Sequence, residues 1–328
     1  MESVRKSRVG TANKHNDRET SAMARLGLSS RIMISFMRAG MNARYGRDGA
    51  RMAASRNPLC ERDERWIETD RGETRAILTR PLGWKEPLPV FINLHGGGFV
   101  AGKADVDDLV CQKISQEVGC LVVNVDYKLA PEYPFPQAIE EIYSLAKLIH
   151  DRPQDFGADP ERVAIGGHSA GGNFAAAVCI LAKRRGGPSF VLQILDYPPL
   201  DIATDPFAKT NVPDMKKVIP PGMAKTFNAA YLEKPENARD PLVSPVFASL
   251  DELRGLPAAL IATAECDSLR DEGEKYAKML GEAGVEVLYR NFAGCKHGFS
   301  HTVPAPQEAV DELWSTIYAK LKEAFRNS

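Results

Sequence analysis

The sequence predicts an α/β protein with a mostly parallel sheet and helices on both of its faces. From residue 90 to the C-terminus, short apolar strand-like runs alternate with helix-like segments. This alternation is typical of parallel sheets that are buried on both faces. A length of 328 residues suffices for one large domain with a smaller appendage. The net charge of −1 argues against a dedicated nucleic-acid binder.

The first sixty residues differ from the rest of the chain in charge. They contain 12 Lys/Arg and 4 Asp/Glu, a balance of +8 against −9 for the remainder. Residues 1–20 are polar, whereas residues 21–55 carry apolar side chains at helical spacing, which predicts one or two short helices. We interpret the basic residues as a solvated helix face. A transit peptide is disfavoured because Glu2, Asp17 and Glu19 break its acid-poor signature.

The sequence contains no segment typical of a signal peptide or a membrane span. The most apolar early stretch, residues 26–41, is interrupted by Arg31 and Arg38. The six cysteines show no Cys-x-x-Cys pairing, which favours reduced thiols. We therefore expect a cytoplasmic protein without stable membrane insertion.

Strands and helices are expected in a regular order after the N-terminal segment. Two strands, 66–69 and 75–79, flank a turn at 70–72. The alternating region then predicts strand 90–94, helix 107–118, strand 120–125, helix 136–150, strand 163–165, helix 173–183, strands 190–195 and 258–262, helix 269–283, strand 285–289 and helix 306–325. Residues 201–245 interrupt this order. They are rich in proline and too long for a connection, which indicates an inserted lid.

A Gly-x-Ser-x-Gly pattern at residues 167–171 joins the strand at 163–165 to the following helix. Strand, sharp turn and helix form the context in which this pattern predicts a nucleophilic serine. Small neighbours let the turn close tightly, so that the hydroxyl of Ser169 stands clear of the backbone. The free N–H groups at the start of the helix then face a bound acyl group.

A glycine run, His95-Gly96-Gly97-Gly98-Phe99, directly follows the strand at 90–94. Glycines let backbone N–H groups approach the negative oxygen that forms during acyl transfer. We expect Gly97, Gly98 and Ala170 to supply those donors. Residues 97–103 also fit a phosphate-binding loop, but Ala104 stands where a magnesium-binding hydroxyl is required, which disfavours nucleotide binding.

A nucleophilic serine needs a base and an orienting acid. Only His297 and His301 follow Ser169. His297 lies in a glycine-flanked loop after the last strand and is the expected base, whereas His301 is expected at the surface. Asp267, just beyond the strand at 258–262, is the expected acid, and Glu265 is the alternative. Asp271 and Glu272 are interpreted as acids of a helix's first turn.

Other reactive side chains near these motifs receive structural interpretations. His168 adjoins Ser169, but neighbouring side chains diverge at a tight turn, so it is a poor base. His95 is expected to brace the glycine run by hydrogen bonds. Cys266 and Cys295 lie close in sequence to the proposed acid and base and are interpreted as packed thiols whose oxidation could perturb the site.

Five motifs together resemble the hormone-sensitive-lipase-like carboxylesterases of the α/β-hydrolase fold. They are His95–Phe99, Asp126–Glu132 with Pro134-Phe135-Pro136, Gly167–Asn173, Asp267–Glu272 and His297–Phe299, and they run in family order over about residues 65–300. One departure is His168, since the family usually has Asp, sometimes Thr, before the serine. A carboxylate there would support the site rather than belong to the triad. The departure bears on the rigidity of the turn and on substrate preference.

The resemblance implies an eight-stranded, mostly parallel sheet with a helical cap. Residues 1–60 would form the N-terminal part of the cap, 61–200 and 246–328 the two parts of the core, and 201–245 the cap insertion. It further implies hydrolysis of short-acyl esters without a cofactor or metal, and members are often homodimers.

The expected chemistry is attack of Ser169 on an ester carbonyl, with His297 as base and Asp267 orienting its ring, so that activity rises with pH as His297 loses its proton. Amidase, deacetylase and lactonase activities use the same residues. A non-catalytic ligand receptor is the alternative from another class, because plant gibberellin receptors resemble this family but lack the histidine.

Overall fold

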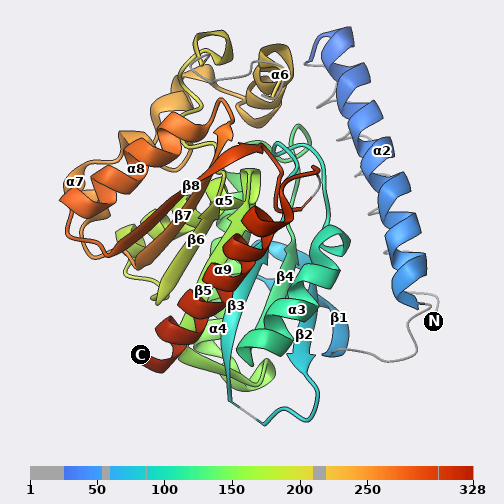
Figure 1. Ribbon diagram of the computed structural model, residues 1–328, viewed down its shortest axis with the longest axis vertical. Helices are drawn as coiled ribbons and strands as arrows, with labels where there is room; N and C mark the ends of the chain where they lie inside the picture. The colour runs from blue at the N-terminus through green and yellow to red at the C-terminus, as the bar shows by residue number, and fades with distance from the viewer. Residues whose placement is uncertain (1–25, 54–59, 86, 210–218, 302, 328) are drawn as a thin grey trace.

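The computed structural model describes residues 26–53, 60–85, 87–209, 219–301 and 303–327, without the side chains of 41–53. The expectations for residues 1–20, including the three acids at positions 2, 17 and 19, lie outside this part of the chain. An eight-stranded sheet in the order β1-β2-β4-β3-β5-β6-β7-β8 forms the centre of the molecule (Figure 1). β1 pairs antiparallel with β2 and β2 with β4, whereas the remaining pairs are parallel. The predicted fold class is confirmed.

The strands and helices follow the predicted alternation closely. The strands are β1 (Cys60–Thr69), β2 (Gly72–Pro81), β3 (Leu88–Leu94), β4 (Leu121–Asp126), β5 (Ala158–His168), β6 (Leu192–Asp196), β7 (Ala258–Cys266) and β8 (Val287–Lys296). The helices are α2 (Leu28–Ala53), α3 (Asp108–Val118), α4 (Gln137–Asp151), α5 (Ala170–Arg185), α6 (Pro221–Tyr231), α7 (Leu250–Leu253), α8 (Arg270–Glu282) and α9 (Gln307–Asn327). Short 3-10 turns, among them η1 (Ala104–Asp107) and η3 (Pro206–Ala208), lie in the connections.

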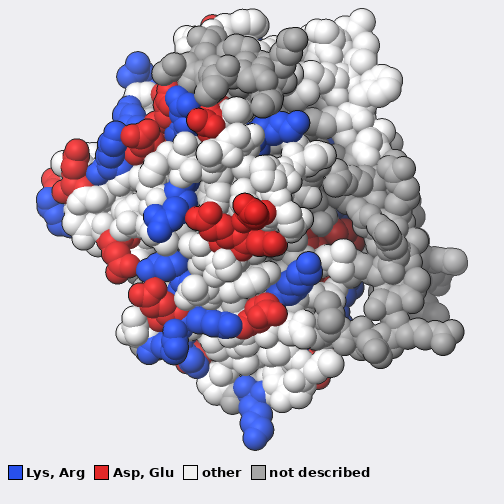
Figure 2. All heavy atoms as spheres, in the orientation of Figure 1, with Lys and Arg blue, Asp and Glu red and all other residues white. Residues whose placement is uncertain are grey.

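Two apolar cores hold the helices on the two faces of the sheet. All seven residues of β3 are buried, as expected for a central parallel strand. Side chains of α3 and α9 form one core with the sheet, and those of α4, α5 and α8 form the other. On the face shown in Figure 2, acidic and basic side chains are interspersed among the described residues rather than gathered into one basic field.

The N-terminal helix α2 is a single helix of 26 residues, longer than the one or two short helices expected. It runs beside the sheet and reaches α6 at one end of the molecule (Figure 1). The hydroxyls of Ser30 and Thr226 join these two helices at 3.2 Å. The guanidinium of Arg38 forms two hydrogen bonds of 2.7 Å to the carboxylate of Glu132 and a third of 2.8 Å to the carbonyl of Val100. Arg38 thereby joins α2 to the loops that follow β3 and β4.

The expected insertion carries η3 and α6 in its described residues, 201–209 and 219–245. Its first part is held by Glu272 at the start of α8. The Glu272 carboxylate accepts a hydrogen bond of 2.7 Å from the amide of Leu200 and pairs with the ammonium of Lys209 at 2.5 Å. Glu272 lies in the first turn of α8, as expected, but it is also 7% exposed and binds residues distant in sequence, which the sequence did not indicate.

No helix in the described parts of the chain has the combination of length and apolar character that crossing a membrane requires.

Candidate active site

Ser169 occupies a strained turn between β5 and α5. Its backbone has φ 54° and ψ −121°, and its amide donates a hydrogen bond of 2.8 Å to the carbonyl of Asp196. Both flanking glycines lie against the carbonyl of Leu94: a Cβ atom at Gly167 or Gly171 would approach that oxygen to 2.2 Å or 1.9 Å. The glycines are thus required by close packing. The serine is held in a backbone conformation that costs energy and that clusters at functional sites.

His297 lies between Ser169 and Asp267 at the carboxyl edge of the sheet. Its Nδ1 lies 2.7 Å from Asp267 Oδ2, and its Nε2 lies 2.9 Å from Ser169 Oγ. Because a carboxylate only accepts hydrogen bonds, Nδ1 must carry the proton of the neutral ring, and Nε2 accepts a hydrogen bond from the Ser169 hydroxyl. Asp267 is 1% exposed, and its other oxygen accepts a hydrogen bond of 3.1 Å from the amide of Leu269. The three predicted residues form one continuous relay.

The loop after β3 turns sharply beside Ser169. Gly97 has φ +139° and Gly98 has φ +60°, a region that favours glycine. A Cβ atom at Gly98 would come within 2.5 Å of the Phe227 ring, and one at Gly97 within 1.9 Å of the Ala101 carbonyl. Ala170 is the first residue of α5, where the amide has no acceptor within the helix. The loop leads into η1, which runs directly into α3. A helix therefore follows the glycine run, and a phosphate-binding loop remains disfavoured because Ala104 stands where a magnesium-binding hydroxyl is required.

The alternative acids do not reach His297. Glu265 Oε2 instead accepts a hydrogen bond of 2.7 Å from the amide of Gly294. Asp271 is exposed and pairs with its neighbour Arg270 at 2.7 Å. Of the carboxylates considered in the sequence, Asp267 therefore has the contact with the histidine.

Two further histidines, His95 and His301, lie close to the site. His95 stacks on Tyr127 with ring centroids 4.1 Å apart, and its Nδ1 donates to the Gly96 carbonyl at 2.8 Å, in agreement with a bracing role. His301 was expected at the surface, and this was wrong, because its side chain is only 8% exposed. It packs between His168 and Trp314, which belongs to α9.

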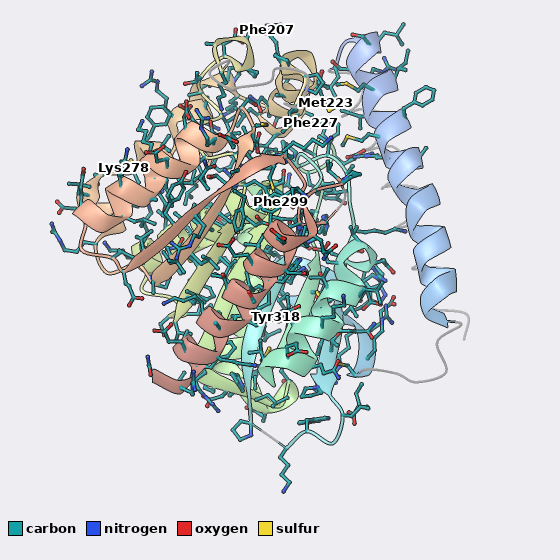
Figure 3. All side chains as sticks on the ribbon, viewed as in Figure 1. Phe207, Met223, Phe227, Lys278, Phe299 and Tyr318 are labelled. Atoms are coloured by element: carbon teal, nitrogen blue, oxygen red, sulfur yellow. The ribbon has the colours of Figure 1, made fainter. Side chains whose placement is uncertain are left out.

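An apolar cavity of about 200 Å³ opens onto Ser169 and His297. α2 contributes Met37, α6 contributes Met223 and Phe227, and Ile202 comes from the segment after β6. Figure 3 labels Met223 and Phe227 beside the upper end of α2. Lys209 also lines the cavity, with its ammonium paired to Glu272. The cavity suits an apolar group attached to the reacting carbonyl.

One residue beside His297, Tyr197, carried no recognisable pattern in the sequence. Tyr197, whose ring lies 4.8 Å from that of His297, has φ 37° and an amide bonded to the Ala262 carbonyl. Neither a motif nor a periodicity identifies it.

The six cysteines are buried and free, as expected, and burial raises the pKa of the Cys295 thiol.

Comparisons with known proteins agree with this geometry. A family model described as an alpha/beta hydrolase fold matches residues 91–301. The carboxylic ester hydrolase LipN of Mycobacterium tuberculosis is 40% identical over 240 residues, which cover 70% of this chain but only 61% of the relative. Carboxylesterase NlhH of the same species is 35% identical over 233 residues, covering 69% and 72%. An esterase of Pyrobaculum calidifontis superposes with a TM-score of 0.79 at 35% identity, covering 88% and 92% of the two chains.

Proposed function

The chain belongs to the hormone-sensitive-lipase-like family of α/β hydrolases, and from this premise we propose that it is a serine carboxylesterase acting on short-acyl esters. The observation that carries the proposal is the relay from Asp267 through His297 to Ser169 at the wall of an apolar cavity. The similar proteins reported above are named as esterases, which supports the ester as substrate.

In the proposed reaction Ser169 is the nucleophile and His297 is first a base and then an acid. Oγ forms a bond to the ester carbonyl carbon while its proton moves to His297 Nε2. The carbonyl electrons move to the oxygen, which becomes negative. As the bond to the leaving alcohol breaks, His297 returns the proton to that alcohol. Water then repeats the sequence on the acyl-enzyme and releases the acid.

The negative oxygen is assigned to three backbone donors. We assign the N–H groups of Gly97, Gly98 and Ala170 to it, because the first two lie in the loop beside Ser169 and the third begins α5. Asp267 stabilises the imidazolium that forms and holds the ring in the tautomer with its proton on Nδ1. No step of this scheme uses a cofactor or a metal ion.

We further propose that residues 1–60 and 201–245 form a cap over a core made of 61–200 and 246–328. Met37, Ile202 and Phe227 support this division, because they line the cavity from both proposed cap segments. A cap that narrows the cavity to about 200 Å³ favours a small acyl or alcohol group. The ester is therefore expected to carry a short chain.

The alternatives receive less support. A ligand receptor on this scaffold has no need of a complete serine–histidine–aspartate relay, whereas this chain has one. Amide and lactone hydrolysis would use the same residues, but the relatives are named for ester hydrolysis. Esters are accordingly the class to test first.

Active-site labelling combined with turnover tests the proposal. A fluorophosphonate should form one adduct, on Ser169, and p-nitrophenyl acetate and butyrate should be hydrolysed faster than the decanoate. Ser169→Ala should abolish both labelling and turnover. Ser315→Ala is the matched control, because Ser315 is an exposed serine on α9 outside the relay and the cavity lining, and it should keep both. A folded wild-type protein without adduct or turnover would favour the receptor.

We also propose a cytoplasmic location and a homodimeric state for the protein. Six buried free cysteines are typical of a reducing compartment, which supports a cytoplasmic location. A homodimer is proposed from the family resemblance, and light scattering behind size-exclusion chromatography tests it directly.

A further inference from the structure

His168 lies between the glycine loop and the start of α3. It is the last residue of β5, directly before Ser169, and is 8% exposed. The amide of Gly96 donates a hydrogen bond of 3.0 Å to His168 Nε2. On the other side of the ring, Nδ1 lies 3.5 Å from Asp107 Oδ2. One imidazole thus spans two segments that are distant in sequence.

These two contacts define where the proton of His168 resides. Because the Gly96 amide is a donor, Nε2 must accept and carries no proton. The proton of the neutral ring is then on Nδ1, which faces the carboxylate of Asp107. Burial, together with the nearby His95 and His297, lowers the pKa of His168 to about 3, so the ring stays neutral near neutral pH.

The ring also sets how close the glycine loop comes to Ser169. A Cβ atom at Gly96 would lie 2.6 Å from Cδ2 and 2.7 Å from Nε2 of His168, so the backbone rests directly on the imidazole. Gly97 and Gly98 are the next two residues. A displacement of Gly96 would therefore redirect the donors assigned to the negative oxygen.

From this geometry we propose that His168 is a positioning residue, which as the Nδ1-protonated neutral imidazole holds Gly96 and thereby aims the N–H groups of Gly97 and Gly98. The inference rests on the proposed esterase function. It assigns to His168 a contribution to transition-state stabilisation rather than to substrate binding.

Neighbouring side chains keep the ring of His168 in place. His301 stacks on it with centroids 3.8 Å apart and planes inclined by 21°. His301 is itself fixed, because its Nδ1 lies 2.9 Å from the hydroxyl of Tyr197 and 2.6 Å from that of Ser300. The Ser300 hydroxyl donates to Asp196 Oδ2 at 2.6 Å. Asp196, Tyr197 and Ser300 thereby hold the ring of His301 against that of His168.

A metal ion is the other ligand that the same cluster suggests, because ligand atoms of Asp107, His168 and His301 lie within 4.8 Å of one another. An imidazole binds a metal ion in the plane of its ring. Two rings stacked face to face cannot place one ion in both planes at bonding distance. The Gly96 hydrogen bond to Nε2 also leaves the proton of His168 on Nδ1, the nitrogen that faces Asp107 and would have to bind the ion, which favours the hydrogen-bonding role.

Asp107 explains why an imidazole suits this position. Asp107 is fully buried and its Oδ1 has no hydrogen-bond partner, while Oδ2 accepts from Asn93 at 3.0 Å. An aspartate at position 168 would place a second carboxylate beside it in a dry environment, where like charges are costly. Histidine accepts from Gly96 and offers a proton toward Asp107 at the same time.

Two variants separate the hydrogen bond from simple packing. His168→Phe keeps a flat ring beside His301 but removes the acceptor, and kcat should fall about 10- to 100-fold with KM unchanged, because the loss acts only on the transition state. His168→Gln restores an acceptor near the position of Nε2 and should stay within about threefold of the wild type. Ser115→Ala is the control, because it removes a buried hydroxyl bonded to the Cys120 carbonyl at the opposite edge of the sheet; it should lower Tm without lowering kcat.

A series of inhibitors tests why kcat falls in His168→Phe. A trifluoromethyl ketone reacts when Ser169 Oγ bonds to its carbonyl carbon and the proton passes to His297, which leaves a negative oxygen on the adduct. Its affinity should fall in proportion to kcat across the two His168 variants. The matching ether, which has no carbonyl, should bind all variants equally. Equal kcat for Phe and Gln, or a loss confined to KM, overturns the proposal.

Two measurements on the folded protein do not depend on activity. Nitrogen chemical shifts of labelled histidine should identify His168 as protonated on Nδ1; protonation on Nε2 overturns the proposal even if His168→Phe fails to fold. Hydrogen exchange at the Gly96 amide should be faster in the Phe variant and unchanged in the Gln variant. If the wild type hydrolyses no ester while these two results hold, the esterase proposal fails and the His168 contact stands.

Discussion

Asp267→Asn tests the relay most sharply, because the structure determines which way the new amide must face. The amide of Leu269 donates to Asp267 Oδ1 at 3.1 Å, so the side-chain oxygen of Asn is retained there. Its NH₂ group, a donor, then faces His297 Nδ1 in place of the carboxylate oxygen at 2.7 Å. To accept that hydrogen bond, His297 must move its proton to Nε2, which points at Ser169.

A histidine in that tautomer cannot take the serine's proton. We expect kcat to fall about 10⁴-fold, the cost of holding such a base in the wrong tautomer, which corresponds to about 5 kcal/mol of activation free energy. Asn has the same number of non-hydrogen atoms as Asp, so it fits this site, where the residue is 1% exposed, and the fold should persist. The assays are p-nitrophenyl butyrate turnover, the rate of fluorophosphonate labelling at Ser169, and thermal unfolding.

Glu265→Gln is the matched control for this experiment. The new amide keeps an oxygen for the Gly294 N–H, so turnover should stay within about twofold of the wild type. If Asp267→Asn retained a tenth or more of the activity, or if Glu265→Gln lost as much as Asp267→Asn, the assignment of the acid would be refuted.

Three further changes have defined outcomes. Arg38→Ala leaves the buried Glu132 carboxylate without its bidentate partner and should lower the free energy of unfolding by about 2–4 kcal/mol, measured by urea titration; Arg38→Lys should lose less. Burial raises the pKa of Asp196 to about 7, so the folded state holds a proton that the unfolded state releases from about pH 4. This one carboxyl therefore contributes stability that is lost as pH rises from about 4 to 7, and the difference in unfolding free energy between the wild type and Asp196→Asn should change by about 2–4 kcal/mol over that range; a difference that does not vary with pH would contradict the burial argument. Phe227→Ala enlarges the cavity and should shift the preferred p-nitrophenyl ester toward the decanoate, whereas an unchanged chain-length profile would exclude the ring as the limiting wall.

The fold was predictable because its signal is local and periodic. Helix α3 was expected at 107–118 and occupies 108–118. Strand β5 was expected only at 163–165 but extends over 158–168: residues 159–162 are polar or proline, and Gly166, Gly167 and His168 are buried without the apolar side chains on which the prediction relied. The N-terminal segment was expected to be helical from its apolar spacing, but its single length of 26 residues and its position were not predicted, because the position depends on contacts such as that of Arg38 with Glu132.

The candidate site was predictable where chemistry demands fixed residue types at fixed places along a parallel sheet. Ser169, Asp267 and His297 each follow a strand end, and order along the chain identified them. The burial of Glu272, a first-turn acid as expected, and the burial of His301 could not be predicted in this way. Their burial is created by Lys209 and Trp314, side chains from other segments, and a single sequence holds no record of such packing.

The placement of the cysteines has a practical consequence for anchoring the protein to a solid support. All six native thiols are buried, so one engineered surface thiol would be the sole reactive handle. The connection between β2 and β3 extends from the end of the molecule opposite α6 (Figure 1), and its Lys85 is exposed. Coupling through Lys85→Cys would orient every immobilised molecule alike, with the mouth of the cavity toward the flowing substrate.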